Sequence, residues 1–213
     1  MGEHPYIETH SRLTYHKETH QFSDKVAAFI VHCLARGADI LFKNRYGHRA
    51  VVLETVAAVP GMVGGVFMHF KSLRTIEDDH GWIQELLAEA ENERMHLMIF
   101  SHISKPNTFE RFLIFFVQFT FIAFYMCLYI ISKKTAHRVV GYFEEQAIHS
   151  YTTYLACIDN GIIYNSKAPQ IAITYWGLAD DATLRDVVEA TREDEVRHRD
   201  VNHTFADKLS KKK

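Results

Sequence analysis

The chain has 213 residues, of which 47% are hydrophobic, and its 24 basic and 26 acidic side chains give a formal net charge of −2. This length can bury a sizeable core, and the balanced charge excludes a broad basic surface for nucleic acid. The cysteines Cys33, Cys127 and Cys157 lack the close spacing of a disulfide framework or a cysteine zinc site. Glycine and proline are too scarce for the many turns of an all-β fold.

The spacing of apolar residues predicts an all-α fold. Residues 1–21 contain no apolar core of a secretory signal, and we expect an extended, His-rich arm there. The apolar pattern then predicts helices at about 23–42, 46–76, 81–103, 108–132, 133–158 and 181–208. We interpret residues 22–208 as one helical domain and residues 209–213 as a basic tail.

Helix ends and breaks are predicted at particular residues. Ser23 and Thr183 are expected to cap the first and last helices. Pro60 and the following glycine should kink the second helix without ending it, because the apolar pattern resumes at Met62. A loop that contains Pro169 is expected to lead into the last helix.

Glu54 stands alone among apolar residues. It is the only Asp, Glu, Lys or Arg between Ala50 and Met68. A carboxylate buried there without a partner would cost several kcal/mol, so it needs a cation or a metal. A salt bridge to Arg49, or a carboxyl group held neutral, is the alternative interpretation.

Glu-x-x-His motifs occur in two predicted helices, where positions i and i+3 can reach one metal ion. They are Glu93 with His96, and Glu195 with His198. A third match, Glu77 to His80, lies in a polar acidic run, and we interpret it as a loop coincidence. One such motif alone is more often a solvated helix face than a pair of ligands.

The motifs together are more specific for a metal site than either motif alone. A di-iron or di-manganese carboxylate bundle takes one Glu from each of two helices and Glu-x-x-His from each of two others. The chain supplies this set from separate predicted helices, in the order Glu54, Glu93 and His96, Glu144, Glu195 and His198. Four carboxylates neutralise two divalent ions, and the oxygen-rich set suits iron or manganese better than zinc. The sequence therefore predicts a dinuclear metal site.

The predicted helix at 108–132 is long and apolar enough to cross a membrane, with no charge between Arg111 and Lys133. A single crossing would separate the metal ligands that precede it from those that follow it. We therefore expect it to lie flat in one leaflet beside residues 23–42, with Lys134 and Arg138 among the cations near lipid headgroups. A buried core helix of a soluble bundle is the alternative.

Four stretches closely resemble the alternative oxidase family over roughly residues 22–207. They are RYGHRAVVLETVAAVPGMVGG, LAEAENERMHLM, AHRVVGYFEEQAIHSYT and TLRDVVEATREDEVRHRDVNH. The family is the cyanide-insensitive terminal quinol oxidase of mitochondria. The resemblance implies a monotopic homodimer on the matrix side of the inner membrane. It also implies that ubiquinol is oxidised and O₂ reduced to water, without proton pumping, at two hydroxo-bridged iron ions.

The resemblance assigns a role to each matching residue. It makes the six residues of the predicted metal site the iron ligands, and Tyr151 a one-electron donor beside them. His137 is similar to a histidine near the quinol and that tyrosine. The surrounding polar network corresponds to Asn92, Asp194, Tyr175 and Trp176. The quinol pocket corresponds to Arg49, Asp39, Leu53, Phe143, Gln146, Ala147 and Ser150, although ordinary packing also explains Leu53, Phe143 and Ala147.

The sequence departs from the family pattern near the expected pocket. Gln146 replaces a carboxylate, and Ala35 replaces an arginine that appears one residue later as Arg36. His48 stands where some members carry a regulatory cysteine, so thiol regulation of that kind is not expected. A membrane-bound di-iron quinone-ring hydroxylase and a ferritin-like iron-binding protein remain the alternative functions, and plastoquinol an alternative substrate.

Overall fold

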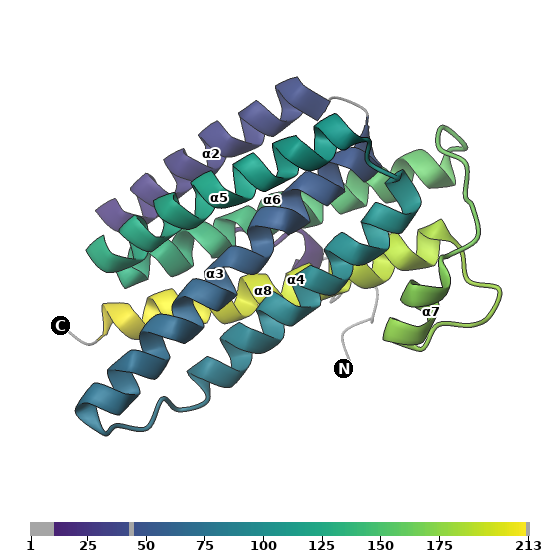
Figure 1. The fold of residues 1–213 in the computed structure, drawn as a ribbon. Helices are drawn as coiled ribbons and strands as arrows, with labels where there is room; N and C mark the ends of the chain where they lie inside the picture. Colours follow the sequence, from purple (N-terminus) through teal and green to yellow (C-terminus); the bar gives the residue numbers. More distant parts are fainter. Residues whose placement is uncertain (1–10, 43–44, 212–213) are drawn as a thin grey trace, which may run out of the picture. The chain divides into compact units, whose positions relative to one another are not determined.

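The structure is a computed structural model that describes residues 11–42 and 45–211. Figure 1 shows a fold built from helices: α2 (Phe22–Phe42), α3 (Tyr46–Thr75), α4 (Trp82–Ser104), α5 (Thr108–Ile131), α6 (Lys133–Asp159), α7 (Gln170–Trp176) and α8 (Leu184–Ser210). Within the described ranges, β pairing is limited to an isolated bridge between Lys167 and Thr183. The predicted all-α class is confirmed.

Each predicted helix is present, with ends displaced by a few residues at most. Three local predictions fail. Residues 11–13 form a helical turn inside the arm that we expected to be extended, while residues 1–10 lie outside the described part. The expected loop after Pro169 contains the short helix α7. Ser23 lies inside α2, because that helix begins one residue earlier.

The helix starts show why one cap prediction succeeded and the other failed. At α2 the residue before the helix is Gln21, and its backbone N–H donates to Asp24 Oδ2 at 3.0 Å. The carboxylate of Asp24 thus provides a hydrogen-bond acceptor at the start of the helix. At α8 Thr183 is the N-cap, and its backbone N–H donates to Asp186 Oδ2 at 2.7 Å, as part of a capping box.

The chain divides into two compact units, and each is described by itself. The central unit comprises residues 37–136, and the terminal unit comprises residues up to 36 together with those from 137 onward. The divisions fall within α2 and α6. The interpretation of residues 22–208 as one domain stays a prediction, as does the separate basic tail, of which residues 212–213 lie outside the described part.

In the central unit, α3 packs against both α4 and α5. The helix continues through Pro60, as predicted. A Cβ atom at Gly61 would overlap the carbonyl oxygen of Leu86 in α4, and one at Gly64 would lie 3.1 Å from the Leu86 side chain. Glycine at both positions therefore lets the backbones of α3 and α4 approach closely.

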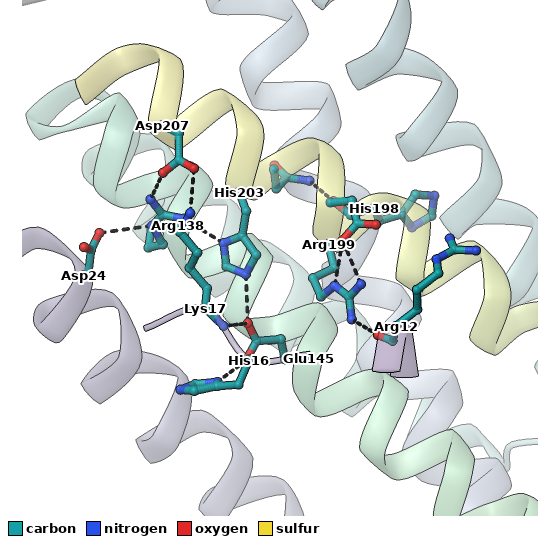
Figure 2. Close-up of polar contacts among 12 residues, drawn as sticks. Arg12, His16, Lys17, Asp24, Arg138, Glu145, His198, Arg199, His203 and Asp207 are labelled. Carbon is teal, nitrogen blue, oxygen red and sulfur yellow. Dashed lines mark hydrogen bonds and ion pairs between the residues drawn. The ribbon is translucent and has the colours of Figure 1, made fainter. Parts of the chain in front are cut away.

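In the terminal unit, a buried arginine joins α2, α6 and α8. Arg138 Nε donates to Asp24 Oδ1 at 3.0 Å, and Nη1 lies 2.9 Å from His203 Nδ1 (Figure 2). Its Nη2 also pairs with Asp207. Arg138 is only 2% exposed, so we expect it to hold these helix segments together rather than to reach a lipid headgroup. This placement argues against the headgroup role expected for Arg138 from the sequence.

Candidate metal centre

The central unit brings together three of the predicted ligands. Glu54 comes from α3, and Glu93 and His96 come from α4, with all three side chains buried. His96 Nδ1 lies 3.3 Å from Glu54 Oε2 and 3.4 Å from Glu93 Oε2. One ligand atom from each of the three lies within 4.8 Å of the others. The glycine contact between α3 and α4 permits this approach.

The terminal unit contains the other three predicted ligands, and all of them are buried. Glu195 and His198 lie one turn apart on α8, with His198 Nδ1 3.3 Å from Glu195 Oε2. Glu144 lies on α6 and is 2% exposed. The two Glu-x-x-His motifs thus have the same local geometry: each histidine directs Nδ1 toward the carboxylate of its own motif.

In each unit these residues could hold a metal ion. Carboxylate oxygens and imidazole nitrogens lie together in buried surroundings there, where the negative charge is costly unless a cation offsets it. The oxygen-rich set with one imidazole in each motif suits iron or manganese. Arg49 pairs with Asp39, so the structure does not support the alternative in which it neutralises Glu54.

The third Glu-x-x-His match behaves differently. Glu77 to His80 lies between α3 and α4, in a segment without helix, and His80 has a left-handed backbone conformation. The side chains of Asp78 and His80 are both 76% exposed. The interpretation of this match as a loop coincidence is confirmed.

A polar cluster from α7 and α8 lies in the terminal unit. Trp176 Nε1 donates to Asp194 Oδ2 at 2.9 Å, and Tyr175 packs edge-on against Trp176 with ring centroids 5.3 Å apart. Asp194 directly precedes Glu195 on α8. The structure therefore brings together three of the four residues that the resemblance assigned to a network around the metals. The fourth, Asn92, is buried beside Glu93 in the central unit.

The predicted quinol residues fall into two groups. In the central unit Arg49 forms an ion pair with Asp39, and Leu53 follows one turn later on α3, half-buried. The remaining residues share a face of α6 in the terminal unit. Of these, Ala147 is buried, Phe143 and Ser150 are half-buried, and Gln146 is exposed. Tyr151 lies on the same helix and is 5% exposed. A common pocket formed by both groups stays a prediction.

The structure shows the surroundings of three further positions at which the sequence departs from the family pattern. Ala35 is half-buried and Arg36 is exposed on α2. His48 Nδ1 lies 3.1 Å from Glu110 Oε1, and Arg45 Nη2 lies 2.7 Å from the same oxygen. Sequence reasoning missed this cluster, which joins the start of α3 to the start of α5, because its members are distant in the chain.

Sequence reasoning also missed Asn202, which links two predicted functional residues. Asn202 Oδ1 lies 3.0 Å from Nδ1 of the buried His137, and Asn202 Nδ2 donates to the backbone oxygen of His198 at 3.0 Å. The contact with His198 could have been predicted, because Asn202 lies four residues later on the same helix. The contact with His137 joins α6 to α8 and could be found only from the structure.

Two titratable groups near the predicted ligand Glu144 have shifted pKa values. Burial alone would raise the pKa of Glu145, but hydrogen bonds from His203, the Lys17 backbone and His16 hold it below its usual range (Figure 2). Burial lowers the pKa of His203, and the hydrogen bond to Glu145 only partly opposes this. Glu145 follows the predicted ligand Glu144, so this network anchors α6 to α8 and to the segment before α2.

Comparison with known proteins identifies the family. Residues 7–207 match the alternative oxidase family. The chain is 57% identical over 195 residues to "Ubiquinol oxidase 2, mitochondrial" of Nicotiana tabacum, which covers 92% of this chain and 66% of that protein. It is 56% identical to "Ubiquinol oxidase 1c, mitochondrial" of Arabidopsis thaliana, covering 92% of this chain and 59% of the relative.

A fungal relative gives the same result. The chain is 54% identical over 194 residues to "Ubiquinol oxidase, mitochondrial" of Batrachochytrium dendrobatidis, covering 91% of this chain and 61% of that protein. The chain thus spans 59–66% of the length of these relatives. The match over nearly the whole chain, together with the buried Glu-x-x-His motifs, shows that this chain belongs to the alternative oxidase family.

Proposed function

We propose that the protein is a ubiquinol oxidase that reduces O₂ to water at a di-iron centre. The observation that carries this proposal is the pair of buried Glu-x-x-His motifs, in which each histidine faces its carboxylate at 3.3–3.4 Å. Family membership and the printed names of the relatives support the choice of quinol and oxygen as substrates.

The residues proposed to hold the two iron ions are Glu54, Glu93, His96, Glu144, Glu195 and His198. Bound iron supplies the redox chemistry that the side chains of the protein lack. The protein contributes four carboxylates, which balance the charge of two divalent ions. The apolar surroundings of Glu54 and Glu93 limit access of water, which protects reactive oxygen chemistry from side reactions.

Orientation of the quinol is proposed to depend on Arg49 and Asp39, whose ion pair presents both a hydrogen-bond donor and an acceptor to a hydroquinone ring. The half-buried and buried side chains on α6 would pack against the ring. His137 would accept a phenolic proton, and Tyr151 supplies a buried phenol near the predicted iron ligand on the same helix. Two quinols supply the four electrons and four protons that one O₂ requires.

Membrane binding is proposed to use α5 without crossing the bilayer. Within the described residues, α3 and α5 are the helices long and apolar enough to span a membrane, but only 11% of the most apolar part of α5 is buried. Exposed phenylalanines extend along α5 from Phe109 to Phe119. On α2, Phe29 and Ile40 are also exposed. Such surfaces suit insertion into one leaflet of the mitochondrial inner membrane, on the matrix side.

Homodimer formation is proposed to use the exposed apolar stripe on α3. Met62, Val66, Phe70 and Leu73 repeat at helical spacing and are 41–64% exposed. Met62 and Val66 also line a groove of about 200 Å³ that is bordered by side chains of α5. Apolar grooves of this kind are suited to burial against a second protein surface.

Oxygen consumption by the purified protein in lipid vesicles with ubiquinol tests the function. We expect cyanide-resistant O₂ uptake, two quinols oxidised for each O₂, water as the product, and two iron ions bound for each chain. The His96→Ala variant should lose iron and activity, because one imidazole ligand is removed.

The matched control is His80→Ala, which changes the exposed third motif and should keep both iron and activity. Retention of iron and full turnover by His96→Ala would contradict the ligand assignment. A hydroxylated quinone ring as the main product would contradict the proposed reaction.

A further inference from the structure

Asn202 links α6 and α8 within the terminal unit. It lies on α8, four residues after the predicted ligand His198, and its side chain is fully buried. It contacts His137, which lies near the start of α6 and is also fully buried. The His137 ring packs edge-on against Phe205 of α8, with centroids 5.3 Å apart. Packing and hydrogen bonding therefore both restrict the orientation of this ring.

The hydrogen bonds of Asn202 to His137 and to the His198 backbone indicate which ring nitrogen of His137 carries the hydrogen. The backbone oxygen of His198 can only accept, so the Asn202 atom 3.0 Å from it must be the amide nitrogen. The amide oxygen then faces His137 Nδ1 at 3.0 Å. An amide oxygen can only accept, so Nδ1 must be the donor. In a neutral imidazole, the hydrogen on Nδ1 leaves Nε2 as the basic nitrogen.

We propose that Asn202 is a positioning residue, which holds His137 as the Nδ1–H tautomer so that Nε2 can accept a proton from the hydroquinone. The proposal rests on the proposed quinol oxidase function for its catalytic meaning. The tautomer itself follows from the contacts of Asn202 and can be measured without turnover. Nothing in this assignment requires His137 to contact a metal ion.

A second buried histidine provides an internal comparison. The Nδ1 atom of His203 lies 2.9 Å from Arg138 Nη1, a guanidinium nitrogen that can only donate. Its Nε2 lies 2.9 Å from Glu145 Oε1, a carboxylate oxygen that accepts. His203 must therefore be the Nε2–H tautomer. Two buried histidines in one unit are thus held in opposite tautomers, His137 by a neutral amide and His203 by a guanidinium on one side and a carboxylate on the other.

The difference in partners suits the two rings to different roles. Both nitrogens of His203 face charged groups, which fix the ring as part of the link between α6 and α8. The amide that faces His137 is uncharged, so it selects the tautomer without adding a net charge beside the ring. A proton acceptor needs this combination of a defined basic atom and a partner that does not compete for the proton.

The direct test is nitrogen-15 NMR of the histidine rings in the full chain, loaded with Zn²⁺ so that the metal site is diamagnetic. The His137 signals are assigned by their loss in His137→Gln. We expect Nδ1–H for His137 and Nε2–H for His203 in the unaltered protein. In Asn202→Ala, His137 should change to a mixture of tautomers or to Nε2–H, and His203 should not change.

Matched variants separate positioning from general damage. Asn202→Asp keeps an acceptor for Nδ1–H, and we expect it to preserve the His137 tautomer even if it weakens the bond to the His198 oxygen. Thr204→Ala changes an exposed side chain two residues away and should leave both rings unaltered. An unchanged Nδ1–H signal in Asn202→Ala, or Nε2–H for His137 in the unaltered protein, would overturn the proposal.

Kinetics with the iron-loaded protein then test the catalytic consequence. Asn202→Ala should lower kcat about tenfold or more with little change in KM, since proton acceptance is impaired while quinol binding is not. In a His137→Gln background, Asn202→Ala should cause no further loss. Additive losses would contradict a role exercised through His137. Absence of any quinol turnover in the unaltered protein would contradict the proposed function instead, and would leave the tautomer result intact.

Discussion

Helices α3 and α5 are similar in hydropathy but differ in burial. Their most apolar segments have mean hydropathy values of 1.8 and 2.2, yet 72% of the first is buried and only 11% of the second. Hydropathy therefore measures how apolar a helix is, whereas the sizes and positions of its side chains decide what covers it.

The side chains of the two helices explain this difference. Most of the buried residues of α3 are alanine, valine or glycine, and their small size permits close approach of α4. On α5 the buried residues are Tyr125 and Tyr129, one turn apart. Tyr129 stacks on Phe67 of α3 with ring centroids 5.3 Å apart. The exposed phenylalanines between Phe109 and Phe119 of α5 are left for an apolar environment outside the central unit.

The largest expected difference comes from placing a charge on each helix. Val59 on α3 is fully buried, and Phe116 on α5 is 59% exposed. Val59→Asp should destabilise the protein by about 4 kcal/mol or more, because the carboxylate is buried in apolar surroundings. Phe116→Asp should leave the fold intact and weaken binding to lipid vesicles.

Circular dichroism and vesicle flotation measure these two effects on the same samples. Unfolding of Phe116→Asp in detergent, or normal folding of Val59→Asp, would contradict the assignment of α3 as the buried helix and α5 as the lipid-facing helix.

The next largest loss of stability is expected from disrupting the close contact between α3 and α4. Gly61→Val would force side-chain atoms against the Leu86 backbone, at a cost of about 3 kcal/mol. Thr120→Val on α5 changes an exposed residue and should alter stability by no more than about 0.5 kcal/mol. Denaturant unfolding of the two variants gives both values. Equal stability losses would show that α3 is no more tightly packed than α5.

A smaller effect is expected at the helix starts. Asn107 caps α5 through a capping box with Glu110, whereas Arg45 precedes α3 without a side-chain cap. Asn107→Ala should cost about 1 kcal/mol. Arg45→Ala should cost about 0.5 kcal/mol, since it removes a half-exposed ion pair. Amide hydrogen exchange in the first turn of each helix measures the loss of stability in each variant. A larger increase in exchange at α3 in Arg45→Ala than at α5 in Asn107→Ala would contradict the expected order.

The smallest expected effect depends on pH. A hydrogen bond from the Asn107 backbone lowers the pKa of Glu110, and Arg45 and His48 lower it further. A carboxyl pKa lowered by folding contributes stability above its unfolded value, and that contribution is lost as the pH falls through the folded pKa. The stability difference between the unaltered protein and Glu110→Gln should therefore shrink below about pH 4.5. Denaturant unfolding at several pH values measures it, and a constant difference would contradict the assigned cause.

Much of the fold could be predicted from local patterns. Apolar spacing located the long helices, and Thr183 correctly marked the start of α8. The loop prediction failed at α7, because seven residues are too few for a clear apolar period. The Ser23 prediction failed because Asp24 competes for the same first turn and begins α2 one residue earlier.

The amino-acid sequence alone specifies the family, the residue types of the predicted metal site and their distribution over separate helices. A carboxylate and a histidine three positions apart share a helix face wherever that helix packs, so this information is local. The tertiary structure decided which face of each apolar helix is buried, and that Arg138 is enclosed by Asp24, His203 and Asp207. It also decided that Asn202 faces His137. These contacts join residues more than 60 positions apart, and their geometry depends on how helices pack rather than on any period in the chain.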